Sequence, residues 1–403
     1  MLLDASLEAA LLQIKQACPR LSAEMIPMAD ALGRVTASEY LAKTDLPAQA
    51  QSAVDGYAVA GLDGGEFGRY TVIGSAFLGD NPITVLTSGQ AMQVKTGGVI
   101  PSGTIAVVPH EKTQVMNDSL KALETIKIGN NIKQAGEDFA IGQQIIARDR
   151  VITPADIALM AAFGIDNISV YRRPRVAIFC LSNNVVPWHQ EPKPGQTRDT
   201  NTLLLQALVQ DEGGLVTRSE LASLDERPAK EIVLDMLDQA DILLLIGGTY
   251  ADQGNEARLL MEELSATLLY WDVPIQPGSH TGAAKLHAKI LFALSGNPAA
   301  CAVGYHLFVA PALKALQGLN PDPIYVNARC VNGFHKKSGS RRFIRGKIYW
   351  DRKGWKVEVL PGQKPSMLRS LIGCNTLIDI PAGSLPIAEG QEVSCLLMKT
   401  FFE

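Results

Sequence analysis

Apolar and polar positions follow different spacings along this chain of 403 residues. Near the N-terminus, apolar residues recur every three or four positions over residues 6–18 and again over residues 28–41, which predicts two helices. Over residues 57–133 the apolar runs become short and are separated by glycine, proline and asparagine. This change predicts a small all-β unit that follows the helices.

The middle of the chain alternates two kinds of segment. Short uninterrupted apolar runs, which are typical of strands buried on both faces, lie at residues 176–179, 242–246, 268–270 and 290–293. Segments with helical spacing lie at residues 154–163, 202–212, 227–237, 256–264 and 298–316. Strands that alternate with helices predict a parallel α/β domain with right-handed crossovers.

From residue 326 to the end, apolar and polar residues alternate again, with turn residues at Asn332-Gly333 and at Arg352-Lys353-Gly354. This pattern predicts a small β-barrel or sandwich. The expected fold class is therefore multidomain, α/β plus β. The expected domains are a helical and linker region at 1–44 and 139–173, an inserted β domain at 45–138, an α/β domain at 174–320 and a C-terminal β domain at 321–403.

Composition narrows the class of protein. The chain is 47% hydrophobic and 19% charged, with a formal net charge of -4, which argues against nucleic acid as the main partner. Its six cysteines form no CxxC pair, which favours buried free thiols in a reducing cytoplasm. The N-terminus reads as an amphipathic helix rather than a signal peptide, and no apolar run approaches membrane-spanning length. We expect a cytoplasmic protein without a membrane partner.

Two glycine-containing loops follow strands of the α/β domain. The apolar run 242–246 ends at Gly247-Gly248, where a backbone without Cβ atoms can turn sharply and let a ligand approach. Residues 295–298, with the sequence SGNP, close another strand and open a long helix whose N-terminus would favour a phosphate. Asn297 could equally be a simple helix cap followed by Pro298 in the first turn.

Three further loops carry polar groups. Asp55 precedes a glycine in SAVDGY, where it is either a turn residue or a metal ligand or acid/base group. Thr96 lies in KTGGVIP, whose hydroxyl and glycine amides are suited to an oxyanion or form an ordinary turn. Glu137 and Asp138 follow Gly136 and are either solvated or ligands for Mg²⁺.

Taken in chain order, SAVDGY, KTGGVIP, GED, IGG and LSGNP resemble the MoeA and gephyrin E-domain family, the molybdopterin molybdenumtransferases. The resemblance covers nearly the whole chain. It implies an elongated homodimer with a MogA-like α/β domain and an active site between protomers. The implied reaction is the Mg²⁺-dependent insertion of molybdate into adenylylated molybdopterin, with release of AMP. Contact with other molybdenum-cofactor enzymes is a further possibility.

The resemblance also implies roles for individual positions. Asp55, Thr96 and Asp138 fall on active-site positions of the family, and the two aspartates would hold the metal. The implied pterin- and nucleotide-binding residues are Asp199, Thr200, Asn201, Gly247, Gly248, Ser295, Gly296, Asn297 and Pro298.

Several positions depart from the family pattern. After the strand at 176–179 the family reads S-T-G-D-E-L, but here both acids are replaced, by Asn183 and Asn184. The aspartate that follows the glycine pair in the family is Asn255 here, although Asp252 lies three residues earlier. In the family motif K-P-G-K-P the two lysines are replaced by Gln276 and Ser279. These changes remove hard ligands for Mg²⁺ and cations that would attract molybdate and phosphate.

Three functions fit this mixture. The first is a divergent transferase with weakened or altered activity. The second is a non-catalytic relative that binds the pterin or acts as a scaffold, and the third is a related pterin or nucleotide enzyme that uses another anion. Cations that could replace the missing lysines are Lys285, His280, Arg258 and Lys289.

Replacement cations should converge on Gly247-Gly248 if the site still takes an anion. In a scaffold, the pocket should instead be neutral or filled by bulky side chains such as Tyr250, Trp188 or His280. For Trp188 and His189 we favour a surface loop over a role in stacking on a pterin.

Overall fold

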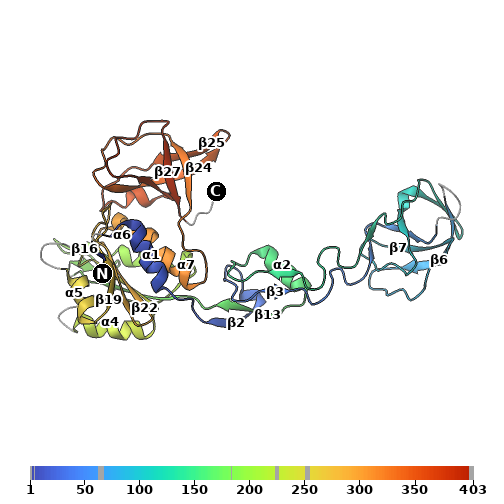
Figure 1. Ribbon diagram of the computed structural model, residues 1–403, viewed down its shortest axis with the longest axis horizontal. Helices are drawn as coiled ribbons and strands as arrows, with labels where there is room; N and C mark the ends of the chain where they lie inside the picture. The colour runs from blue at the N-terminus through green and yellow to red at the C-terminus, as the bar shows by residue number, and fades with distance from the viewer. Residues whose placement is uncertain are drawn as a thin grey trace. The chain divides into compact units, whose positions relative to one another are not determined.

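The computed structural model of the protein describes residues 2–3, 5–61, 68–182, 184–222, 227–249 and 255–398. The chain divides into two compact units (Figure 1). The first unit comprises Met1–Ala37, Asp149–Ile152 and Asn167–Glu403, and the second comprises Ser38–Arg148 and Thr153–Asp166. Asn183, Tyr250 and Asp252 lie outside the described residues. The four predicted domain boundaries stay a prediction.

The second unit is built around a six-stranded sheet, in agreement with the predicted β unit. Its strand order is β8-β5-β7-β6-β10-β9, and only β6 and β7 pair in parallel. Successive residues of β5 enter opposite faces, with Tyr57 in one core and Ala58 in the other. Its elements are β3 (Tyr40–Leu41), β4 (Gln51–Ser52), β5 (Gly56–Val59), β6 (Arg69–Ala76), β7 (Gln90–Val94), β8 (Ala106–Pro109), η2 (His110–Lys112), β9 (Thr113–Met116), β10 (Ser119–Ala122), β11 (Ile132–Lys133), β12 (Gln144–Ile146) and α2 (Pro154–Ala162).

The predicted helix over residues 28–41 is wrong. Only a 3-10 turn forms there, η1 (Met28–Asp30). Gly33 adopts a left-handed φ of +73°, which stops a right-handed helix. Val35 then makes a β-bridge with Val151, so tertiary pairing overrides the helical spacing of the apolar residues.

The first unit contains the predicted α/β domain, whose sheet has the order β1-β19-β21-β22-β18-β14-β17. Helices cover both faces, because Leu244 of β18 packs in a core with α1, α3, α6 and α7, whereas Leu243 packs in a core with α4 and α5. The sequence did not predict β17 and β21. Since β21 runs antiparallel to β19 and β22, the sheet is mixed rather than wholly parallel.

The bounds in this unit follow the chain. The strands are β1 (Leu2–Leu3), β2 (Ala23–Pro27), β13 (Asn167–Tyr171), β14 (Arg175–Cys180), β15 (Val185–Val186), β16 (Thr197–Arg198), β17 (Leu215–Leu221), β18 (Ile242–Ile246), β19 (Thr267–Trp271), β20 (Ile275–Gln276), β21 (Gly282–Leu286) and β22 (Lys289–Leu294). The helices are α1 (Leu7–Ala17), α3 (Asn201–Asp211), α4 (Ala229–Asp238), α5 (Glu256–Glu263), α6 (Pro298–Gly304), the π-helical η3 (Tyr305–Val309) and α7 (Ala310–Leu316).

One continuous helix in the described part of the chain, Pro298–Leu316, is long and apolar enough to cross a membrane by length and composition. This corrects the expectation that no such segment exists. Within its most apolar window, 89% of the residues are buried inside the protein. The helix is therefore apolar because it packs in the core of the α/β domain.

The C-terminal part of the first unit is a closed five-stranded barrel, drawn in orange and red in Figure 1. The strands pair in the order β24-β25-β23-β27-β26, and β26 pairs back with β24. The short strand β20 joins β24 from outside the ring, with Gln276 opposite Arg342. The strands are β23 (Tyr325–Cys330), β24 (Arg341–Asp351), β25 (Gly354–Val359), β26 (Thr376–Ile380) and β27 (Glu392–Leu397), with the 3-10 turn η4 (Arg369–Leu371).

Candidate active site

The glycine loops of the α/β domain meet where β14, β18 and β22 end. The Gly247 N–H donates to the carbonyl oxygen of Leu294 over 2.9 Å. A Cβ atom placed on Gly296 would lie only 3.6 Å from the Gly247 Cα atom. The Asn201 amide joins the two loops, because its Nδ2 donates to the carbonyl oxygen of Gly296 over 2.7 Å. The structure thus brings together Asn201, Gly247 and Gly296, as the resemblance implies.

Buried polar atoms at this edge lack partners among the described residues. They are Asn201 Oδ1, Thr202 Oγ1 and Asn255 Oδ1. Burying a polar atom without a hydrogen bond costs about 1–3 kcal/mol, so such atoms point to a bound ligand. Asp199 is also buried, and its carboxylate accepts from the Thr202 N–H over 3.0 Å. The sequence did not single out Thr202, although it adjoins the predicted Asp199–Asn201 stretch.

Neighbouring positions contribute backbone rather than side chains. Gly248 has a φ of +63°, and a Cβ there would lie 3.2 Å from the Ala257 nitrogen. Thr200 and Asn297 precede α3 and α6, and neither side chain makes a capping hydrogen bond. Simple capping therefore does not explain Asn297. The Ser295 hydroxyl accepts from the Asn297 N–H over 3.2 Å, and Pro298 occupies the first turn of α6.

In the second unit, Asp55 lies in the turn before β5 and contacts the glycine loop after β7. Its Oδ1 accepts from the Thr96 N–H over 2.8 Å and from the Thr96 hydroxyl over 2.9 Å. Its Oδ2 accepts from Lys95 Nζ over 3.0 Å. The Thr96 N–H, then Lys95 and the Thr96 hydroxyl, lower the pKa of Asp55 to about 2. Because Thr96 gives both donors to Asp55, it does not offer them to an oxyanion as expected.

Asp138 lies in the same unit, in the loop that follows β11. Its carboxylate is 3.9 Å from Lys133 Nζ, and its N–H donates to the carbonyl oxygen of Leu46 over 3.0 Å. Glu137 turns back and accepts from the Gln134 N–H over 2.7 Å. Each carboxylate proposed as a metal ligand thus has its own lysine.

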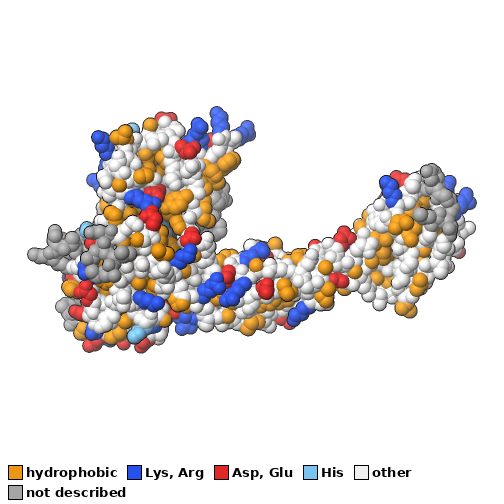
Figure 2. Space-filling view, viewed as in Figure 1, with side chains coloured by type: hydrophobic (Ala, Val, Ile, Leu, Met, Phe, Trp, Pro, Cys, Tyr) orange, Lys and Arg blue, Asp and Glu red, His pale blue; other side chains and the backbone are white. Residues whose placement is uncertain are grey.

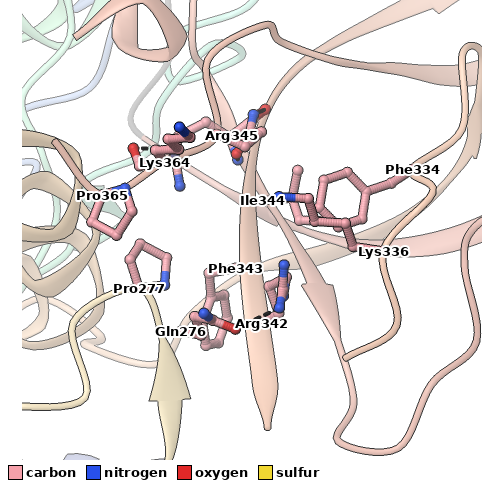
Figure 3. A pocket seen from close by; sticks show the side chains of 11 residues that line it. Gln276, Pro277, Phe334, Lys336, Arg342, Phe343, Ile344, Arg345, Lys364 and Pro365 are labelled. Carbon is pink, nitrogen blue, oxygen red and sulfur yellow. Dashed lines mark hydrogen bonds between the residues drawn. The ribbon is translucent and has the colours of Figure 1, made fainter. Parts of the chain in front are cut away.

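A cationic pocket of about 110 Å³ lies between β20 and the barrel (Figure 3). Figure 3 shows Pro277 facing Pro365 and Lys364, with Gln276 bonded to Arg342. Four of the lining residues are cations and none is acidic. The pocket is lined by Gln276, Pro277, Phe334, Lys336, Arg342, Phe343, Ile344, Arg345, Gln363, Lys364 and Pro365.

Arg345 is the most buried cation of this pocket, with a relative exposure of 1%. Its Nε donates to Ser370 Oγ over 3.1 Å, and its Nη2 lies 3.3 Å from the carbonyl oxygens of Gly362 and Lys364. Neutral oxygens thus hold the guanidinium, and burial lowers its pKa to about 10. A buried cation held only by neutral groups is suited to a bound anion.

Three family models match the chain in order: "MoeA N-terminal region (domain I and II)" over residues 5–164, "Probable molybdopterin binding domain" over residues 177–315, and "MoeA C-terminal region (domain IV)" over residues 327–398. The chain belongs to the MoeA family. The molybdopterin molybdenumtransferase of Bacillus subtilis (strain 168) is 29% identical over 388 residues, which cover 93% of this chain and 90% of that one.

Further similarities are as extensive. The molybdopterin molybdenumtransferase of Staphylococcus aureus (strain MSSA476) is 27% identical over 381 residues, 93% of this chain and 91% of that one. The crystal structure of the molybdopterin biosynthesis MoeA protein from Pyrococcus horikoshii OT3 matches with a TM-score of 0.84 at 27% identity, covering 99% of this chain and 100% of that chain. These matches establish the MoeA architecture of the chain.

In this MoeA-family chain, the cations expected to replace the family lysines are engaged elsewhere. Lys289 donates to the carbonyl oxygens of Leu237 and Ala240 at the end of α4. Lys285 pairs in register with Ile290, near the start of β22 and therefore away from the glycine loops at its end. Arg258 bonds Glu262, and His280 Nδ1 lies 3.2 Å from Asp272.

The cations in the cationic pocket come instead from the barrel. Sequence reasoning missed them, although Arg341, Arg342 and Arg345 fall within five residues of one strand. The bulky residues weighed for a scaffold do not line this pocket: Trp188 is exposed and packs edge-on against His189, as expected for a surface loop. The MoeA-family site thus keeps positive charge beside Gln276 from a different part of the chain.

Proposed function

We propose that this chain acts in molybdenum cofactor biosynthesis as a molybdopterin molybdenumtransferase whose insertion of molybdate is weakened or altered. Its substrates would be molybdate and adenylylated molybdopterin, and AMP would be released. The observation that carries this proposal is the cationic pocket beside the cis peptide Gln276-Pro277, because it replaces the charge of the missing family lysines.

The cationic pocket has the size and charge for a small tetrahedral oxyanion. Its volume of about 110 Å³ is well below the roughly 300–1,000 Å³ of sites for larger organic ligands. Arg342 and Lys364 line its wall and Arg345 its buried base. Guanidinium and ammonium donors form strong charge-assisted hydrogen bonds with oxyanions. Molybdate, a substrate with two negative charges, is the ligand we assign here.

The charge of the barrel region supports the same assignment. Residues 321–403 contain thirteen Lys and Arg against seven Asp and Glu, whereas the whole chain has a net charge of -4. Figure 2 shows Lys and Arg side chains along the rim of the barrel. A basic surface around the cationic pocket raises the local concentration of anionic substrates.

The glycine loops are the proposed site of the pterin and its nucleotide. The Asn201 group that faces the Gly296 carbonyl must be the NH2, because a carbonyl only accepts hydrogen bonds. Asn201 Oδ1 is therefore the free acceptor, and Asn255 Oδ1 lies buried and unpaired in the same region of the α/β domain. Buried acceptors require donors, and the amino and ring N–H groups of a pterin or an adenine supply them.

The described residues do not fit the Mg²⁺ that the family implies. Asp55 and Asp138 are paired with lysines, and Asn184 and Asn255 are neutral where the family has acids. Among the described residues, no three His, Cys, Asp or Glu side chains come together as a metal site. We therefore derive no step through a metal.

Isothermal titration with molybdate tests the proposal. Arg342→Gln should weaken binding about tenfold or more, because it removes a charged donor from the cationic pocket. The matched control is Lys353→Gln, which removes an exposed cation from the turn between β24 and β25 and should bind like the unaltered protein. Release of AMP from adenylylated molybdopterin then measures the reaction itself.

The results separate the proposed functions. Molybdate binding that needs Arg342, together with release of AMP, supports the transferase. Pterin binding without either result would contradict it and favour a non-catalytic pterin-binding or scaffold protein. Equal loss of binding in both variants would contradict the assignment of the cationic pocket.

We further propose a cytoplasmic homodimer that contacts other molybdenum-cofactor enzymes. Its support is the resemblance to the family alone. Sedimentation equilibrium of the purified chain tests the dimer, and a mass of one protomer, 43.3 kDa, at micromolar concentration would contradict it.

A further inference from the structure

The Asp55 turn contains its own cation. Lys95 and Thr96 are adjacent residues of one glycine loop, and together they contact both oxygens of the Asp55 carboxylate. Thr96 holds Oδ1 with two donors, so the carboxylate cannot rotate freely. Its Oδ2 then faces Lys95 Nζ at 3.0 Å. This oxygen is the position that a divalent cation would need.

Backbone contacts fix the loop that carries Lys95. In the sheet, Val94 pairs with Gly56, so the residues that follow Val94 and precede Gly56 meet directly. The Gly98 N–H donates to the carbonyl oxygen of Lys95 over 2.8 Å. A Cβ on Gly98 would lie 3.0 Å from that same oxygen, so the turn needs glycine. These contacts reduce the entropy lost when an exposed pair forms.

The second candidate ligand repeats the arrangement. Asp138 has Lys133 at 3.9 Å, so both acids that the family would offer to Mg²⁺ face an ammonium group. Two cations close to one carboxylate repel each other, and a divalent ion at Asp55 would first have to displace Lys95.

We infer that Lys95 is a built-in counter-ion that takes the place of a divalent cation at Asp55. This inference deepens the proposed function and rests on it for the identity of the site. The ammonium supplies positive charge next to an anionic substrate, so this part of the site works without Mg²⁺. The expected ligand class is a phosphate or another oxyanion rather than a metal.

Binding of Mn²⁺, followed by electron paramagnetic resonance and by calorimetry, tests the inference without any activity assay. The full-length protein should show no Mn²⁺ site that depends on Asp55. Lys95→Met should create one with an affinity at least about tenfold higher, because a repelling charge is removed. The double variant with Asp55→Asn should lose this site again. Lys95→Arg keeps the charge and should stay metal-free.

Three results would overturn the inference. They are an Asp55-dependent Mn²⁺ site in the unaltered protein, no such site in Lys95→Met, or one in Lys95→Arg. Lys95→Gln is a second neutral variant if Lys95→Met does not fold, as judged by thermal melting. Molybdate titration of the same samples separates the two proposals, because a failure there concerns the cationic pocket and leaves the Mn²⁺ result unaffected.

Discussion

At the scale of single residues, the two candidate sites depend on how the surroundings stabilise a charge. Asp55 is exposed, yet hydrogen bonds from Thr96 and Lys95 favour its ionised form and lower its pKa to about 2. Arg345 shows the opposite effect, because burial disfavours its charged form and lowers its pKa to about 10. A bound anion would restore the stability of the Arg345 charge, which makes its position suited to molybdate.

The lowered pKa of Asp55 predicts how its contacts respond to acid. A free aspartate has a pKa of about 3.9, so the contacts of Asp55 contribute stability above that pH and lose it as pH falls through about 2. We expect its carboxyl ¹³C shift to remain that of the ionised form at pH 3.5. In Lys95→Met the midpoint should move upward. A midpoint near 4 in the unaltered protein would contradict the geometry of the turn.

At the scale of elements, some positions are fixed by backbone packing that the sequence only partly reveals. Gly56 begins β5 between β7 and β8, and a Cβ there would lie 2.1 Å from the carbonyl oxygen of Val108. Because the obstacle is a backbone atom in a central strand, it cannot move without breaking the pairing. The glycine of SAVDGY is thus required by the sheet, which in turn positions Asp55.

Gly56→Ala should therefore destabilise the second unit by about 3 kcal/mol, as expected for overpacking against backbone. Thermal and urea unfolding measure the loss. The matched control is Gly74→Ala in β6, where the nearest atom to a new Cβ is the end of Met92 at 3.9 Å. Equal stability of the two variants would show that the β5–β8 pairing is looser than described.

A second element contact joins the barrel to the α/β domain. Arg341 donates to both carboxylate oxygens of Asp379 over 2.9 and 2.6 Å, and it also bonds Glu8 of α1. The Asp379 side chain is only 10% exposed, so the pair is largely removed from water. Since Arg342 follows directly, this contact fixes the strand end that carries the cationic pocket.

Arg341→Met should lower the free energy of unfolding by about 2–3 kcal/mol, because it leaves the buried Asp379 carboxylate unpaired. It should also weaken molybdate binding through the displaced Arg342. Lys15→Met is the control, since the Lys15–Asp322 pair is 49% and 61% exposed and should contribute less than about 1 kcal/mol. Similar losses in both variants would contradict the difference in burial.

At the scale of the whole molecule, local periodicity predicted most elements and missed long-range pairings. The strand at Ile242–Ile246 and its glycine turn were predicted, because a buried strand has an unmistakable apolar run. The cationic pocket was not, because Gln276 and Arg342 are 66 residues apart and meet only through the pairing of β20 with β24. The helix over residues 28–41 failed for the same reason, since its residues pair with distant strands.

The central claim is that the barrel supplies the cations of an oxyanion site beside Gln276 and Pro277. The most direct measurement is anomalous X-ray diffraction from crystals grown with tungstate, which has the shape and charge of molybdate. The account predicts a tungsten peak in the cationic pocket, within hydrogen-bonding distance of Arg342, Arg345 or Lys364, and its loss in Arg342→Gln. Tungsten peaks elsewhere, with none in that pocket, would contradict it.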